Sequence, residues 1–297
     1  MLINISTHSA IHSWRPACWL KATGTDAANF LQGQFTNDLR ALRASPSVYG
    51  LWLSVKGKVL ADSFVLKGAT PDEFWIGSYF SPAAAIRERL EAYIIADDVT
   101  LEDRTAEWHG VTVLGEAAAA LLQEPHDPAR VFVFPGRRDT RVNAEFVYRG
   151  ADGEPAWVAA ATRLDAVGML RRRIRAGIPA VPVDAGPGDL PNEAGLEGAA
   201  ISYTKGCYLG QEVMARLKSM GQVRRRLRRI RGTSGPPPPT PAAVFAAARQ
   251  VGELRSAVTE EAGWIGLAML SRLHVKPDTA LAWSADGPAA IEVLEGP

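Results

Sequence analysis

The apolar positions in the first third of the chain fall into three runs that predict β-strands. These runs are Val48–Val55, Val59–Leu66 and Glu73–Phe80. Lys56-Gly57-Lys58 separates the first two and predicts a tight hairpin turn with glycine at its centre.

Two helices are predicted around these strands. Thr25 is a suitable cap, and Phe30 and Leu31 begin an apolar face behind it. Ser81-Pro82 predicts a second helix, with serine as the cap and proline at the first helical position. Ile86 and Leu90 supply its buried stripe.

A second block of mixed pattern runs from about 111 to 161. It predicts a helix and three short strands, at Glu116–Gln123, Val131–Phe134, Ala144–Tyr148 and Trp157–Ala160. A further helix is predicted over Asp165–Ala176 and ends at Gly177, a plausible C-cap.

The rest of the chain is punctuated by proline. Four prolines among glycine and aspartate make Ile178–Asn192 an extended, irregular connection. Four consecutive prolines within residues 232–241 predict a semi-rigid linker. Short apolar runs alternate with glycine over Val244–Trp283, as in a small β-domain. These patterns together predict an α+β protein of two or three lobes.

Composition excludes several classes of protein. The 297 residues carry 33 basic and 32 acidic side chains, so a generic polyanion binder is not expected. No apolar run approaches the ~20 residues that span a bilayer, and residues 1–16 do not resemble a signal peptide. Only two cysteines, Cys18 and Cys207, favour a reducing cytoplasm. No common metal-ligand, phosphate-loop or nucleophile-elbow motif is found, and no metal site is predicted.

The segment from 190 to 217 carries the most chemistry. Lys205-Gly206-Cys207 predicts a turn, and a helix is predicted from about Gly210. Leu209, Val213 and Leu217 recur at the spacing of a buried helical stripe.

Cys207 therefore lies just before a helix N-terminus and two residues after Lys205. Both features favour thiolate over thiol, because the helix dipole and the ammonium stabilise negative charge. The thiol is thus a candidate nucleophile, redox sensor or metal–sulfur contact. The alternative is a small buried apolar side chain.

The octet Lys205–Glu212, followed by Ala215-Arg216, resembles the signature of the YgfZ family, folate-binding proteins related to the aminomethyltransferase (T-protein) of the glycine cleavage system. Other segments agree in order and spacing with that family, namely Phe30–Asp38, Lys56–Leu60, Ala176–Pro179 and the tail from Gly252 to Ala268. The resemblance covers nearly the whole chain.

The resemblance implies three lobes around a central tetrahydrofolate pocket. It also implies a role in assembly or repair of iron–sulfur clusters in client enzymes, with the signature cysteine required. The corresponding layout is a folate-binding region over 1–231, a linker over 232–241 and a β-barrel domain over 242–297. Within the first region, one lobe takes about 1–105 with 178–231 and the other 106–177.

The candidate site residues follow from the matched motifs. Cys207, Lys205 and Asp62 are the candidates for chemistry. The candidates for folate binding or for shaping the site are Gln32, Thr36, Asn37, Asp38, Arg175, Glu193, Gly206, Tyr208, Gly210, Gln211, Glu212 and Arg216. In this interpretation Gly206 and Gly210 allow close backbone approach, and Arg216 holds Glu212 in place. Capping and turn formation alone account equally well for the polar run Gln32–Asp38, and Asp62 has the alternative of bonding local backbone in its hairpin.

The chain departs from a true aminomethyltransferase at two positions. Ala61 replaces one of two adjacent carboxylates in the T-protein hairpin, and Arg175 stands where T-proteins have a glutamate facing the pterin. A guanidinium only donates hydrogen bonds, so it cannot accept from the pterin N–H groups. We therefore expect a protein that is not a conventional turnover enzyme. The alternatives are a folate-dependent aminomethyltransferase and a non-catalytic scaffold.

An arginine-rich stretch, Arg216–Arg231, raises a separate hypothesis of nucleic-acid binding. Val223, Leu227 and Ile230 interleave with the arginines, and no aromatic residue lies between them for stacking on bases. A solvated face is the default interpretation. A site for the glutamate tail of folate or for an acidic protein partner comes next, and specific nucleic-acid binding is not expected.

Overall fold

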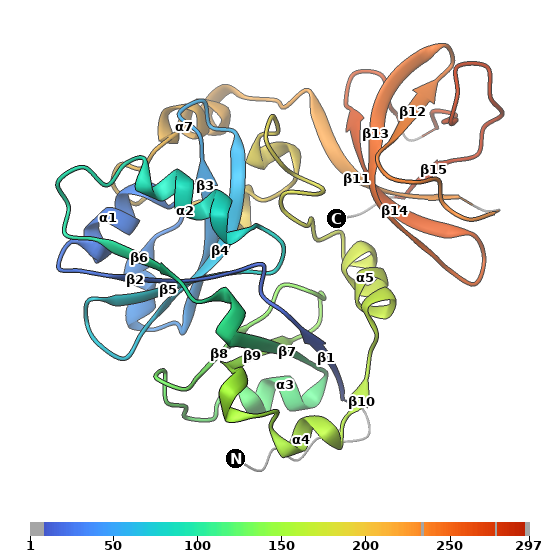
Figure 1. Ribbon diagram of the computed structural model, residues 1–297. Helices are drawn as coiled ribbons and strands as arrows, with labels where there is room; N and C mark the ends of the chain where they lie inside the picture. The colour runs from blue at the N-terminus through green and yellow to red at the C-terminus, as the bar shows by residue number, and fades with distance from the viewer. Residues whose placement is uncertain (1–8, 233–234, 277, 295–297) are drawn as a thin grey trace.

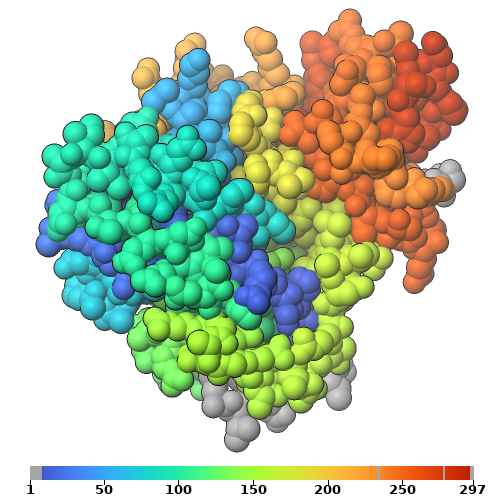
Figure 2. Space-filling view, in the orientation of Figure 1, coloured from blue at the N-terminus to red at the C-terminus, as the bar shows by residue number. Residues whose placement is uncertain are grey.

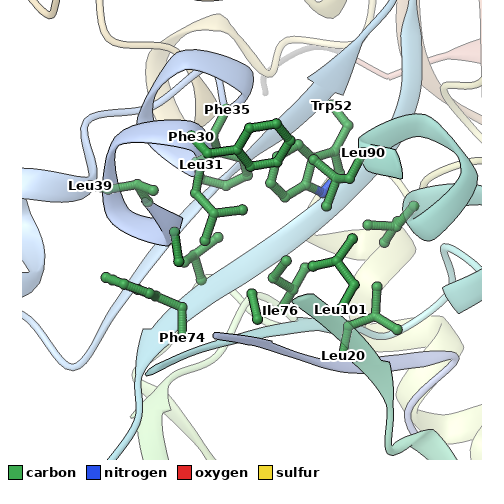
Figure 3. Close-up of a cluster of buried hydrophobic side chains, with 14 of the residues drawn as sticks. Leu20, Phe30, Leu31, Phe35, Leu39, Trp52, Phe74, Ile76, Leu90 and Leu101 are labelled. Carbon is green, nitrogen blue, oxygen red and sulfur yellow. The ribbon is translucent and has the colours of Figure 1, made fainter. Parts of the chain in front are cut away.

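The computed structural model describes residues 9–232, 235–276 and 278–294, and in this part of the chain three five-stranded sheets define three lobes (Figure 1). The first sheet has the order β3 (Ser47–Leu53), β4 (Val59–Lys67), β5 (Glu73–Ser78), β2 (Cys18–Thr23), β6 (Thr100–Asp103). Helices α1 (Ala27–Gln34) and α2 (Ala83–Glu91) and the 3-10 turn η1 (Leu39–Arg43) cover one face of it. Phe30, Phe35 and Trp52 lie at the centre of that buried layer (Figure 3).

The second lobe has the sheet order β10 (Thr162–Arg163), β1 (Ala10–Trp14), β7 (Trp108–Leu114), β9 (Asn143–Arg149), β8 (Val131–Pro135). Helices α3 (Glu116–Leu121) and α4 (Ala156–Ala159) cover its outer face. An aromatic layer joins the inner faces of the two sheets, with Trp19, Trp75, Trp108 and Phe132 in mutual ring contact. Side chains alternate across a strand, so β4 sends Val65 toward the helices and Phe64 toward the second lobe.

The irregular connection after α5 (Ala166–Arg175) returns to the first lobe. Val181, Leu196 and Met214 pack with Leu51 and Val59 in one hydrophobic cluster. This segment contains η4 (Pro191–Glu193), α6 (Glu197–Ala200) and α7 (Gln211–Met220). Residues far apart in the sequence therefore share one core.

The C-terminal lobe is a curled half-barrel, as the fold class predicted, and forms the orange-to-red mass in Figure 2. Its strand order is β12 (Ala242–Ala246), β13 (Arg249–Thr259), β14 (Trp264–Ser271), β11 (Arg225–Gly232), β15 (Glu292–Val293). Ile174 of α5 packs on Val258, Ile265 and Leu267, so α5 attaches this lobe to the other two. The prediction of an α+β protein with a small C-terminal barrel is confirmed.

The strand pairing differs from the predicted domain layout at two places, namely the linker at 232–241 and the N-terminal residues 10–14. Strand β11 precedes the proline run and pairs with β14 along its whole length, so the prolines join two strands of the C-terminal lobe instead of linking domains. The strand was missed because only Leu227 and Ile230 interrupt its arginines, and it acquires order from its partner strand. Residues 10–14 belong to the second sheet, because β1 pairs with β7 and β10.

The segment predicted as a strand at Trp157–Ala160 instead belongs largely to α4. Its neighbouring Trp157 and Val158 are both buried, which in a short apolar run does not distinguish a strand from a helical turn. Residues 1–8 of the N-terminal segment and residues 233 and 234 of the predicted linker lie outside the described residues. Among the described residues, no helix is both long and apolar enough to cross a bilayer.

Candidate functional site

The signature loop around Cys207 is fastened to the end of α1. The Leu209 N–H donates to the Gly33 carbonyl at 3.1 Å, and the Ser202 N–H donates to the Thr36 carbonyl at 3.0 Å. We call this contact between residues 32–38 and 202–210 the signature seam. It joins two of the motifs that carried the family resemblance.

Lys205 is the centre of the signature seam. Its ammonium donates to the carbonyls of Gln32, Phe35 and Asn37, at 2.5, 2.7 and 3.0 Å. A lysine ammonium has three N–H donors, so all three are engaged. The side chain is 4% exposed, and burial lowers the pKa of Lys205 to about 8. Lys205 thus satisfies carbonyls where α1 ends, which differs from the predicted role of stabilising a Cys207 thiolate.

The polar run after α1 is also engaged within the seam. Thr36 is fully buried; its hydroxyl donates to the Ala200 carbonyl at 2.7 Å and accepts from the Leu51 N–H at 2.8 Å. Asn37 donates to the carbonyls of Tyr49 and Ala199.

Two side chains of this run shape the turn into η1. Gln32 donates to Asp38 and accepts from the Leu39 N–H. Asp38 caps η1, and hydrogen bonds from the Arg40 guanidinium hold the pKa of Asp38 well below its ordinary value. Capping and turn formation therefore describe the contacts of this run.

Cys207 itself is exposed at the surface of the seam and precedes Gly210, the N-cap of α7. The other cysteine, Cys18, is fully buried and donates to the Ile76 carbonyl, and burial raises its pKa. The two thiols therefore differ sharply in their access to solvent and partners. The alternative of a buried apolar role for Cys207 is wrong.

The two signature glycines differ in how closely other atoms approach them. Gly210 has φ +85°, and a Cβ there would lie 2.9 Å from the Ser54 carbonyl oxygen of the hairpin. A Cβ at Gly206 would meet nothing within 4 Å. Close backbone approach therefore applies to Gly210 and not to Gly206.

The remaining signature side chains lie on or before α7. Tyr208 is buried in the cluster with Leu51 and Met214, and burial raises its pKa to about 12. Gln211 is half-buried, whereas Glu212 and Arg216 are exposed. No ion pair or hydrogen bond between described residues joins Glu212 to Arg216, so the predicted positioning of Glu212 is wrong: in solvent the pair gains too little to hold both chains together.

Asp62 lies apart from the thiol, on the β4 face that looks toward the second lobe. Its carboxylate accepts hydrogen bonds from the hydroxyls of Ser81 at 2.7 Å, Ser78 at 2.8 Å and Tyr49 at 3.0 Å. Burial raises the pKa of Asp62, against the opposing effect of these donors. Ser81, predicted as a helix cap, instead serves Asp62, and Pro82 is the N-cap of α2.

Arg175 and Glu193 are both engaged in ion pairs. The Arg175 guanidinium contacts Glu260 of the C-terminal lobe at 2.6 Å. Glu193 pairs with Arg225 at 3.0 Å and accepts from the Leu190 N–H. The Arg175 guanidinium is therefore engaged with the C-terminal lobe through Glu260.

Three residues of the arginine-rich stretch form ion pairs. Arg225, Arg226 and Arg231 contact the carboxylates of Glu193, Glu197 and Glu292 respectively. These three side chains remain 39%, 41% and 52% exposed, so the default interpretation of a solvated face stands for them, with the addition that tertiary packing brings distant acids to them. Their engagement leaves them poorly available to a phosphate backbone.

Two cavities lie where the three lobes meet. One, of about 440 Å³, is lined by Arg137, Arg226, Arg228 and Arg229 together with the stretches 177–179 and 194–196, and no carboxylate of a described residue lines it. We call it the cationic cavity. The other, of about 390 Å³, is mostly apolar and is lined by residues that include Phe80, Met169 and Val183.

Arg228 is the least engaged of these arginines. Its guanidinium makes no hydrogen bond or ion pair with any other described residue, and its Nε is buried. Arg137 stacks on Tyr49, 4.0 Å from the ring centroid, and favours the charged form of Asp62. The cationic cavity therefore adjoins the Asp62 cluster.

None of the predicted folate-binding residues lines either junction cavity. Sequence reasoning missed Tyr49, Ser78 and Arg137, and it included Arg228 only as one member of the arginine-rich stretch. The pair Arg137-Arg138 directly after Pro135-Gly136 was the available signal, because a basic pair in a turn is a candidate anion contact. No local pattern distinguished Arg228 from its arginine neighbours.

Family models match two parts of the chain. Residues 17–143 match the GCVT N-terminal domain, and residues 224–293 match the CAF17 C-terminal beta-barrel domain. The second match begins at β11, in agreement with the observed extent of the C-terminal lobe.

Similar proteins of known name cover most of the chain. The iron-sulfur cluster assembly factor IBA57, mitochondrial, of Homo sapiens is 32% identical over 300 residues, spanning 93% of this chain and 79% of that protein. The tRNA-modifying protein YgfZ of Edwardsiella ictaluri is 29% identical over 245 residues, spanning 75% and 70%.

Among solved structures, the glycine cleavage system aminomethyltransferase T from Bartonella henselae superposes with a TM-score of 0.79. It is 16% identical in sequence, and the match covers 97% of this chain and 85% of that one. At this identity the likeness establishes the fold alone.

Proposed function

This chain belongs to the family of the iron-sulfur cluster assembly factor IBA57 and of YgfZ, and from that premise we propose that it assists the assembly or repair of iron–sulfur clusters in client proteins. The observation that carries the proposal is the exposed thiol of Cys207 on the signature seam. Thiolate is the ligand that iron–sulfur clusters prefer. An accessible cysteine on a rigid seam suits contact with a cluster or with the protein that holds one.

The rigidity of the seam supports this role. Lys205 and Thr36 hold the loop through buried hydrogen bonds to backbone groups, and Gly210 locks it against the hairpin. A functional side chain works best when its supporting contacts fix its position. In this proposal Lys205 is a positioning residue for Cys207.

We further propose that the cationic cavity holds a tetrahydrofolate. The donors fit this ligand: Arg228 has a buried, unpartnered Nε, and guanidinium groups recognise carboxylates such as those of the glutamate tail in bidentate geometry. Tetrahydrofolate supplies a carrier for one-carbon units. Asp62 accepts a hydrogen bond from Tyr49, and the Tyr49 ring lies against Arg137 of the cavity. In this proposal Asp62 would therefore face the ring end of tetrahydrofolate from the first lobe.

Aminomethyl transfer is less well supported. Asp62 is a single carboxylate already accepting three hydroxyl hydrogen bonds, and its neighbour Ala61 packs on the opposite, helix-covered face. A non-catalytic scaffold remains the alternative that differs most from the proposal, since it requires no thiol.

Cys207→Ser separates these functions. In a host lacking its own family member, we expect native protein and Cys18→Ala to restore iron–sulfur enzyme activity and Cys207→Ser to lose it, with matched thermal unfolding of all three. Full restoration by Cys207→Ser would favour the scaffold.

In native protein only Cys207 should react with iodoacetamide, because Cys18 is buried. A rate no faster than free cysteine would exclude an activated thiolate.

Calorimetric titration tests the folate proposal. We expect tetrahydrofolate to bind native protein and to bind Arg228→Gln about tenfold more weakly, the equivalent of ~1.4 kcal/mol. Arg224→Gln is the matched control, because Arg224 is exposed and lies outside the cationic cavity. Equal loss in both variants, or no binding to native protein, would refute this site.

The proposed partners are iron–sulfur client or assembly proteins. The name of the human relative places that protein in mitochondria. For this chain we propose the cytoplasm, since two unpaired cysteines suit a reducing compartment. Although the Edwardsiella relative is named for tRNA modification, the ion pairs of Arg225, Arg226 and Arg231 do not favour specific nucleic-acid binding here.

A further inference from the structure

A large groove separates the first lobe from the C-terminal lobe on the side where the chain leaves α7. In Figure 1 the chain crosses there from α7 to the half-barrel as β11. The groove has a volume of about 1,030 Å³. Lys58 of the hairpin, Leu217 of α7 and residues 222–225 form one side, and residues 249–253 of β13 face them. We call it the barrel groove.

The barrel groove carries a surplus of positive charge. Five basic side chains and two acidic ones line it. Both acids are neutralised within the fold, Glu193 by Arg225 at 3.0 Å and Glu253 by Arg255 at 2.6 Å. The remaining three cations are Lys58, Arg224 and Arg249.

These three cations have no carboxylate partner among the described residues. Lys58 donates to the Gly188 carbonyl and Arg249 contacts the His274 ring at 2.8 Å, so neither charge is neutralised. Arg224 is exposed, and its side chain contacts no described acid. The groove therefore presents an uncompensated positive potential to solvent.

The walls of the groove are apolar between these charges. Leu217, Val223, Val251 and Met269 line it, and no Phe, Tyr or Trp is among the lining residues. A single-stranded nucleic acid gains much of its affinity by stacking bases on aromatic rings, which this surface does not offer. Apolar walls with flanking cations instead suit a polypeptide that has acidic and aliphatic side chains.

We propose that the barrel groove binds a segment of a partner protein that is rich in acidic residues and leucine. The inference rests on the proposed function in one respect, that the partner is an iron–sulfur client or assembly protein. Leu217 belongs to α7, the helix whose N-terminus follows Cys207. A segment docked there tethers its protein to the helix of the signature and raises the effective concentration of that protein near the thiol.

Fluorescence anisotropy with a labelled peptide of alternating glutamate and leucine tests the groove. We expect saturable binding to the full chain, weakened about tenfold or more in the double variant Arg224→Glu, Arg249→Glu. The matched control is the double variant Arg43→Glu, Lys67→Glu, which changes the net charge by the same amount at two exposed cations without an ion pair to any described residue. Equal weakening in the control would show non-specific attraction and overturn the proposal.

Two comparator ligands complete the test. A peptide in which serine replaces leucine, at the same charge, should bind more weakly because it loses the apolar contacts. A single-stranded RNA of equal charge should also bind more weakly. Equal or tighter binding of either ligand would overturn the assignment to an acidic and apolar protein segment.

The outcome is distinguishable from failure of the proposed function. Cys207→Ser should bind the peptide as native protein does, because Cys207 does not line the groove. If Cys207→Ser restores iron–sulfur enzymes in the host yet the groove variants lose the peptide, the groove remains a partner site and the thiol role fails. If the groove variants bind the peptide normally, the groove proposal fails whatever the thiol does.

Discussion

The signature seam and the cationic cavity differ in whether their polar side chains have partners within the protein. In the seam, motif residues such as Lys205, Thr36 and Asn37 direct their polar groups to backbone carbonyls and leave one thiol exposed. In the cavity, arginines from outside the family signature converge from different lobes, and among the described residues the Arg228 guanidinium has no partner. Residues of the family signature thus support the backbone, whereas the candidate anion site is built from Arg137 and from the arginine-rich stretch.

The difference has a physical origin. A loop that must hold one exposed side chain needs its backbone satisfied, and a buried lysine or threonine does this by hydrogen bonding. A ligand pocket needs unpaired donors, which the fold tolerates where lobes meet and a charged guest can enter. The two regions should therefore respond differently to substitution.

The largest expected effect lies in the seam, at Lys205. Lys205→Met leaves three carbonyls without their donor, one buried at Phe35 and two partly buried at Gln32 and Asn37, and an unsatisfied buried group costs about 1–3 kcal/mol. We expect the free energy of unfolding in urea to fall by about 3 kcal/mol or more. Lys56→Met, in the exposed hairpin turn, should leave it nearly unchanged. Equal stability of the two variants would contradict the role of Lys205 as the centre of the seam.

The two signature glycines give a smaller and internally matched effect. Gly210→Ala forces a side chain into left-handed backbone and against the Ser54 carbonyl, and the backbone conformation alone costs roughly 1–2 kcal/mol. Gly206→Ala meets open space and should change stability by no more than about 0.5 kcal/mol. Chemical denaturation measures both. A larger loss for Gly206→Ala would show that the loop is not held as described.

On the cavity side, Asp62 should make stability depend on pH. Because burial raises its pKa, the native state keeps a proton that the unfolded chain has released, and stability falls as pH rises from the ordinary value of 3.8 through the raised one. Asp62→Asn removes this dependence. The free energy of unfolding of Asp62→Asn minus that of native protein should therefore be larger at pH 7 than at pH 4. The control Asp72→Asn, at an exposed position, should show no such trend. Urea unfolding at both pH values decides, and an opposite trend would contradict the assigned direction.

The smallest expected effect tests whether the two regions act independently. Arg228→Gln alters the cavity without touching the seam, so the rate of Cys207 alkylation should change less than about twofold. Native protein and Arg224→Gln provide the reference rates. A larger change specific to Arg228→Gln would mean that the cavity and the thiol are coupled.

Much of the fold followed from local pattern. The hairpin of β3 and β4, strands β8 and β9, and α5 ending at Gly177 all lie close to their predicted positions. Strand β11 and the two-residue strand β10 were not predicted, because neither has an alternation of apolar and polar residues that indicates a strand. Both are ordered by pairing with a neighbouring strand. The position of Cys207 before α7 was predicted, but its exposure was left open and the direction of the Lys205 ammonium was not foreseen, because the acceptors of Lys205 lie some 170 residues earlier.

By itself, the sequence determined the elements whose signals are local: the hairpin turn, the apolar stripes, the helix end at Gly177 and the Lys-Gly-Cys signature with its family resemblance. The tertiary structure alone decided which polar groups met. Arg175 contacts Glu260, Arg225 contacts Glu193, and Arg228 faces a cavity with no partner among the described residues. Periodicity and capping act over a few residues, whereas the partner of a long charged side chain depends on how distant segments pack, and no local pattern records that.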